Sequence, residues 1–225
     1  MRQDFHADID ALVDRLVATA ALCDDMLTGA LDALAAPGAP GSAQVVARDN
    51  EIDTAYQSIQ ETVLNLFALQ APVASDLRML AAILHANIHV ERLGDYAASV
   101  ARTAGRVADL DDDAQVVDTL QTMAAAATEV SRASVRSLAE RDVDLARSLP
   151  QLDDAVDSRY FDVFRSIVRR AGSDEDQMEW ATNMIIVARS IERYGDHAVD
   201  IGEQTIYAVT GGFVELSSST ARTTD

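Results

Sequence analysis

Apolar residues recur every three to four positions along most of the chain, as they do on the buried face of an α-helix. The N-terminal stretch shows this spacing at a series of mostly apolar positions: Leu12, Leu16, Thr19, Leu22, Met26 and Ala30. Convincing runs of alternating apolar and polar residues bounded by turns, which would predict strands, do not occur in the sequence. The pattern therefore predicts an all-α protein.

Prolines, glycines and an acidic cluster divide this pattern into six helices. The expected ranges are 4–36, 42–69, 74–103, 109–140, 142–170 and 173–211. Gly105 is expected to end the third helix, and Pro150 to bend or restart the fifth. The carboxylates of Asp109–Asp113 suit the positive N-terminus of the fourth helix, and a Pro/Gly loop is expected at 37–41.

The two halves of the chain repeat one another. Glu-Arg-Leu-Gly-Asp at 91–95 returns as Glu-Arg-Tyr-Gly-Asp at 192–196, a separation of 101 residues. A weaker match relates 48–53 to 152–157. We therefore predict two tandem three-helix bundles, residues 1–108 and 109–212, lying side by side, followed by a disordered Ser/Thr-rich tail at 213–225.

Each predicted unit carries two pairs of acids spaced four residues apart. The pairs are Asp49 with Asp53, Glu91 with Asp95, Asp153 with Asp157, and Glu192 with Asp196. Residues at this spacing lie on one helix face, where like charges repel, so nearby arginines or a bound cation should compensate. Four carboxylates converging from two antiparallel helices are a ligand set for hard cations or iron. A solvated acidic face is the alternative.

A glycine and an arginine accompany the second acid pair of each unit. Gly94 and Gly195 sit inside predicted helices, where glycine costs about 1 kcal/mol relative to alanine. Close approach of two helices would explain them, and so would room for a metal cluster. Arg92 and Arg193 are expected to orient or partly neutralise the neighbouring carboxylates.

Composition narrows the classes of function. The 225 residues include 37 Asp and Glu against 18 basic residues, every one an arginine, so the net charge is −19. This balance argues against binding nucleic acid or an anionic membrane surface. The single cysteine, Cys23, allows no internal disulfide and is expected to be a buried apolar residue. Since no signal peptide or membrane span is apparent, a cytoplasmic location is expected.

Catalytic motifs are scarce. The sequence contains no phosphate-binding or nucleophile-elbow motif and no Glu-x-x-His, the last of which argues against a ferritin-like di-iron oxidase. His85, His89 and His197 lie roughly 100° around their helices from the acid pairs. We therefore expect them to be surface histidines, or groups that support the carboxylates from outside.

Two segments carry a family resemblance. Pro-Val-Ala-Ser-Asp-Leu-Arg at 72–78, followed by Glu-Arg-Leu-Gly-Asp-Tyr-Ala at 91–97, resembles the first half of PhoU, the phosphate-uptake regulator family. The segments 188–201 and 207–211 resemble its second half, so the resemblance covers almost all of Phe5–Gly211. The all-arginine, alanine-rich composition is typical of a high-GC source such as the actinobacterial branch of the family.

The resemblance implies a function and a cofactor. PhoU-like proteins are non-enzymatic negative regulators that couple the ATPase subunit of the phosphate ABC transporter to a phosphate-responsive sensor histidine kinase. They hold multinuclear iron or zinc clusters on the acid motifs, so the eight acids above become the expected ligands; Mg or Mn is a further option. We expect a homodimer that meets the membrane only through its partners.

Departures and rival interpretations follow from the same residues. Asp200 stands where the family often has Asn, and the connection at 36–41 lacks the charged segment usual in the family. A metal-free helical adaptor and an iron-carboxylate enzyme are the two alternatives. Metal content, and its dependence on the motif acids, separates the three.

Overall fold

Six long helices make up the computed structural model, which describes residues 2–36, 41–110, 113–170 and 174–216. Their bounds are α1 Arg2–Ala35, α2 Gly41–Gln70, α3 Ala74–Arg106, α4 Ala114–Glu140, α5 Val143–Arg170 and α6 Glu175–Thr210. Within these described ranges there is no strand, and the all-α prediction is confirmed. None of these helices combines the length and apolarity needed to cross a membrane.

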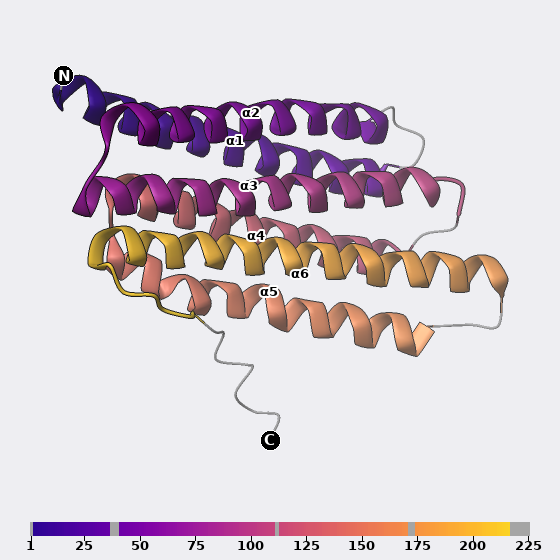
Figure 1. Cartoon of the computed structure of the whole chain (residues 1–225). Helices are drawn as coiled ribbons and strands as arrows, with labels where there is room; N and C mark the ends of the chain where they lie inside the picture. The colour runs from indigo at the N-terminus through magenta and orange to yellow at the C-terminus, as the bar shows by residue number, and fades with distance from the viewer. Residues whose placement is uncertain (1, 37–40, 111–112, 171–173, 217–225) are drawn as a thin grey trace.

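The helices form two three-helix units that lie side by side. Figure 1 shows α2, α3, α6 and α5 next to one another, with α1 and α4 behind them. Contacts join all three pairs among α1, α2 and α3, and all three among α4, α5 and α6. The units meet where α3 packs on α6 and α1 on α4. The division predicted near residue 108 falls between α3 and α4, and its position to the residue stays a prediction.

Local chemistry explains several helix ends. Asp113, the last of the predicted acidic cluster, caps α4 by accepting hydrogen bonds from the backbone N–H groups of Gln115 and Val116. Gly211 ends α6 in the left-handed region, at a φ of 79°. The predicted connections at 37–40 and around Gly172 lie outside the described residues.

Gly105 and Pro150 both lie inside helices, and the prediction that Gly105 ends the third helix is wrong. Gly105 lies inside α3, which continues to Arg106. A Cβ at Gly105 would meet the Ser42 hydroxyl at 3.2 Å, so the glycine allows α2 to approach α3 closely. Pro150 also lies within an uninterrupted helix, so α5 does not restart there.

A buried polar link joins the two units. The Tyr194 hydroxyl of α6 donates to Asp24 Oδ1 of α1 at 2.7 Å, and Arg132 Nε of α4 donates to Asp24 Oδ2 at 3.1 Å. Both Asp24 and Tyr194 are buried, and burial raises the pKa of Asp24 although these donors oppose it. Most other buried residues are apolar, although hydroxyl and amide side chains such as Ser137, Thr205 and Asn87 are buried among them. Small residues of α3 such as Ala97 and Ala101 let its neighbours pack closely.

The segment after α6 returns to that helix. The Phe213 ring stacks on Tyr207, with ring centroids 4.5 Å apart, and the Leu216 N–H donates to Glu203. Residues 213–216, the start of the tail predicted to be disordered, thus pack on α6. The rest of that tail, 217–225, lies outside the described residues.

Candidate metal centres

The four acids of the first unit lie between α2 and α3. Burial, then the charge of Asp95, raises the pKa of Glu91, with Asp53 and Asp49 adding to the rise. Asp49 responds in the same way, its pKa raised by burial and by Asp95 and Asp53. Glu91 and Asp49 are therefore each within electrostatic reach of the other three acids.

The second unit repeats this arrangement between α5 and α6 with deeper burial. Asp153 is 3% exposed, and burial, followed by the charges of Asp157, Asp196 and Glu192, raises its pKa to about 8. Burial also raises the pKa of Glu192 and of Asp196. The second cluster is thus the one whose charges are least solvated.

Arginines pair with the α3 and α6 acids in parallel ways. Arg92 donates to Asp95 at 2.8 Å and lies 3.6 Å from Glu91. Arg193 repeats this pairing, 3.4 Å from Asp196 and 3.9 Å from Glu192. Additional partners are Arg102, 3.8 Å from Asp49, and Arg189, 2.8 Å from Glu192. Arginine compensation, one of the two options predicted for the repelling acids, is therefore present on α3 and α6.

The repeated glycines serve different neighbours in the two units. A Cβ at Gly94 would meet Ile52 Cδ1 at 2.6 Å, so Gly94 lets an apolar side chain of α2 pack against α3. A Cβ at Gly195 would collide with Asp153 Oδ1. The first glycine therefore permits close helix packing, and the second makes room for an acid that was predicted to be a metal ligand.

One atom of the second cluster tests whether these residues suit a cation. Among the described residues, no hydrogen-bond donor reaches Asp153 Oδ1, although the atom is buried. A buried carboxylate oxygen without a donor is costly, and a cation removes that cost. The carboxylate-only donor set suits hard cations and iron. The second cluster therefore fits a metal, while the first cluster, whose acids are more exposed, offers no such buried oxygen among the described residues.

The tightest group of candidate ligands lies elsewhere. Among the described residues, His89, His197 and Asp200 form the group whose donor atoms lie within 4.8 Å of one another. The two Nδ1 atoms are 3.0 Å apart, and each is 3.3 Å from Asp200 Oδ2. Burial lowers the pKa of His89, while the charge of Asp200 opposes that change. Sequence spacing does not bring these residues together, because His89 and His197 belong to different helices and are 108 residues apart.

Cys23 takes no part in these clusters. It is fully buried, its S–H donates to the Val90 carbonyl at 3.4 Å, and burial raises the pKa of the thiol. Because the thiolate is the nucleophilic form, this environment makes the side chain inert, as predicted.

Comparison with known proteins identifies the family to which this fold belongs. The fold and acid clusters define a class: all-α proteins of two tandem three-helix units, each with carboxylates between its second and third helices. The family model described as the PhoU domain matches the chain twice, at residues 16–104 and 120–205. The chain belongs to the PhoU family.

Two curated relatives resemble it over almost their whole length. A protein of Deinococcus radiodurans is 33% identical over 211 residues, 94% of this chain and 99% of the relative. A protein of Pseudomonas aeruginosa is 30% identical over 209 residues, 93% of this chain and 86% of the relative. Both are named phosphate-specific transport system accessory protein PhoU homolog.

Solved structures agree on the fold. The crystal structure of PhoU from Pseudomonas aeruginosa matches with a TM-score of 0.85 at 30% identity, covering 92% of this chain and all of that one. The phosphate transport system regulatory protein PhoU from Streptococcus pneumoniae matches with a TM-score of 0.84 at 22% identity, covering 94% of this chain and all of that one. At 22% identity, the second match supports the fold alone.

Proposed function

We propose that this chain is a non-enzymatic negative regulator of phosphate uptake and of the phosphate-starvation response. The observation that carries the proposal is membership of the PhoU family over nearly the whole chain, with relatives named for phosphate transport. In this role the protein is a cytoplasmic adaptor between the ATPase subunit of a phosphate ABC transporter and a phosphate-responsive sensor histidine kinase. It acts as a homodimer and reaches the membrane only through these partners.

The surface charge is compatible with an adaptor role. A net charge of −19 favours association with basic protein surfaces over nucleic acid or anionic lipid. Long helices without a catalytic motif provide extended faces for two partners at once. The negative charge of the protein also attracts cations.

Metal ions in the two carboxylate clusters belong to the same proposal. Asp49, Asp53, Glu91 and Asp95 would hold the first cluster, and Asp153, Asp157, Glu192 and Asp196 the second. A bound ion would supply positive charge that offsets the mutual repulsion of the acids and joins α2 to α3 and α5 to α6. The buried Asp153 Oδ1, which no donor reaches among the described residues, is the observation that supports this part.

Deleting the gene tests the regulatory role. In phosphate-rich medium the deletion strain should express phosphate-starvation genes that the parent strain keeps off, and the intact gene supplied in trans should switch them off again. Transcript levels of the transporter genes measure the effect. If those levels are the same with and without the gene, in a strain that lacks any paralogue, the regulatory proposal is wrong.

Partner capture tests the adaptor role separately. Tagged protein drawn from phosphate-rich and phosphate-starved cells should retain the transporter ATPase and the sensor kinase, with amounts that depend on phosphate. Binding of neither protein under either condition would contradict the adaptor role.

A further inference from the structure

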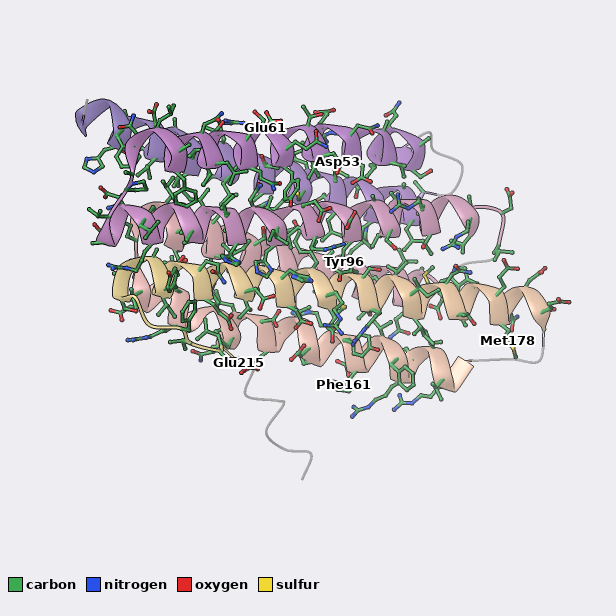
Figure 2. All side chains as sticks on the ribbon, in the orientation of Figure 1. Asp53, Glu61, Tyr96, Phe161, Met178 and Glu215 are labelled. Carbon is green, nitrogen blue, oxygen red and sulfur yellow. The ribbon has the colours of Figure 1, made fainter. Side chains whose placement is uncertain are left out.

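The interface between the two units holds a cluster of three ligand atoms that is distinct from the acid motifs. His89 comes from α3, and His197 and Asp200 come from α6. All three side chains are partly buried, with exposed fractions of 20%, 23% and 37%. The Tyr96 ring, labelled in Figure 2 between α3 and α6, stacks on the His197 ring with centroids 5.6 Å apart. This stacking fixes the plane of one imidazole.

The spacing of the three atoms matches a coordination sphere. Metal–nitrogen bonds of about 2.0–2.1 Å and metal–oxygen bonds of about 2.0–2.2 Å place neighbouring ligand atoms roughly 2.9–3.4 Å apart at octahedral or tetrahedral angles. The observed separations are 3.0 Å between the nitrogens and 3.3 Å from each nitrogen to the oxygen. One ion can therefore contact all three atoms without any rearrangement of the helices.

The three atoms also suit a cation by their charge. Asp200 Oδ2 lies 3.3 Å from each Nδ1, so an ion held between the three atoms would contact a carboxylate oxygen and two imidazole nitrogens at once.

We propose that His89, His197 and Asp200 bind one divalent transition-metal ion such as Zn²⁺, which clamps α3 to α6. Imidazole nitrogen selects zinc, iron, cobalt or nickel over Mg²⁺ and Ca²⁺, which prefer oxygen ligands. Three protein ligands leave at least one position for water or for a group on a partner. This site is independent of the regulatory role and of the carboxylate clusters proposed above.

The repeat predicts that there is one such site per chain. At the 101-residue spacing of the repeat, His89, His197 and Asp200 correspond to Ser190, Tyr96 and Ser99. Those positions offer no imidazole, so the cluster has no copy in the other half. A site confined to one place in two similar units can be removed without disturbing the equivalent acid motifs.

Zinc analysis of the full-length protein tests the proposal. Metal-free protein is loaded with Zn²⁺ and dialysed, and bound zinc is counted for the wild type and for H89A, H197A and D200N. Each variant should retain one equivalent fewer than the wild type, and zinc titrations should show a loss of affinity of about 100-fold or more at this site, since even altered supporting residues cost 10–100-fold. D200N, which changes one atom, guards against misfolding.

Two controls decide between sites. H85A removes an exposed histidine of α3 that lies outside the cluster and should keep the full zinc content. E179Q changes an exposed acid of α6 outside this cluster and the acid motifs, and it should keep the full zinc content. An anomalous zinc peak among the three ligand atoms in a crystal supports the proposal. Equal zinc content in the wild type, H197A and D200N would overturn it, as would loss of one equivalent in H85A or E179Q.

Discussion

Asp153 is the most deeply buried of the eight motif acids. Its side chain is buried against Gly195, close to three other carboxylates, and its pKa is raised to about 8. In the unfolded chain the same group ionises near its ordinary value of 3.8. Folding of the metal-free protein therefore favours the protonated form of Asp153.

This difference predicts a pH-dependent stability. The contribution of protonated Asp153 to the free energy of unfolding is complete below about pH 4. It is lost as the pH rises to about 8, at roughly 1.4 kcal/mol for each unit by which the pKa is raised. In metal-free protein, the free energy of unfolding in urea should fall by several kcal/mol over that range. D153N should fall much less, and added metal should stabilise the wild type at pH 8 more than the variant.

A surface acid of the same helix provides the control for this experiment. Asp162 lies on α5 with a side chain that is 66% exposed, so D162N should keep the pH profile of the wild type. A wild-type profile in D153N as well would show that burial of Asp153 does not set the pH dependence.

The acid pairs could be predicted at residue level, but the histidine cluster could not. The i, i+4 spacing places two carboxylates on one face whatever packs against it, so the sequence alone indicates the pairs. His89 and His197 meet only because α3 packs on α6, and their rotation about their own helices does not reveal which neighbour they face. The one available signal was that Asp200 and His197 are three residues apart, a spacing that shares a helix face.

At the scale of elements, glycine controls how closely helices approach. The sequence left open whether Gly94 and Gly195 serve helix packing or a metal site. In the structure Gly94 lies against the apolar Ile52, and Gly195 lies against the acid Asp153. Gly105 was expected to end a helix, since glycine is costly inside one. The structure shows why this prediction failed. A side chain at position 105 would crowd Ser42, so the close approach of α2 favours glycine inside the helix. Sequence spacing does not reveal that approach.

Alanine substitutions at the two equivalent glycines should have different effects. G195A pushes the Asp153 carboxylate from its position, so metal affinity of the second cluster should fall about 10–100-fold. G94A crowds the buried Ile52, which costs about 1–3 kcal/mol, offset by about 1 kcal/mol of helix propensity. Metal titration and urea unfolding of both variants measure these effects. Equal losses of metal affinity in G94A and G195A would contradict the distinction.

At the scale of the whole molecule, buried polar contacts tie the two units together. Asp24 of the first unit receives hydrogen bonds from Tyr194 and Arg132 of the second. The packing of α3 on α6 and of α1 on α4 adds to this link. The two units should therefore unfold in one transition and not one after the other.

Removing one hydroxyl tests this coupling. Y194F leaves the buried Asp24 carboxylate with one hydrogen bond fewer, so the free energy of unfolding should fall by about 1.5–3 kcal/mol within a single transition. Y160F, in a half-buried tyrosine of α5, should change stability by less than about 0.5 kcal/mol. Circular dichroism in urea measures both, and a separate early transition in Y194F would contradict a shared core.

The architecture was predictable because its determinants are local or repeated. Proline, glycine and acidic segments mark the helix ends, and the doubled Glu-Arg-x-Gly-Asp motif indicates two units. Only the family resemblance placed the two units side by side. The repeat and the helical spacing do not reveal which helix of one unit packs on which helix of the other, and the structure shows α3 on α6 and α1 on α4.

Helix α6 presents different chemistry on three sides. At about 100° per residue, Glu192 and Asp196 occupy one side, Asp200 and His197 lie roughly a quarter to a third of a turn further round, and Tyr194 lies almost opposite Glu192. These sides meet α5, α3 and the buried Asp24 of α1. The helix thus presents three functional groups of side chains at fixed angles around its axis.

Rotation of α6 about its own axis moves all three groups of side chains together. A turn of ~20° displaces side chains ~5 Å from the axis by ~2 Å, about ten times the tolerance of a metal–ligand bond. Whatever holds one side of α6, whether an ion or a docked protein, therefore also fixes the angular setting of the other two.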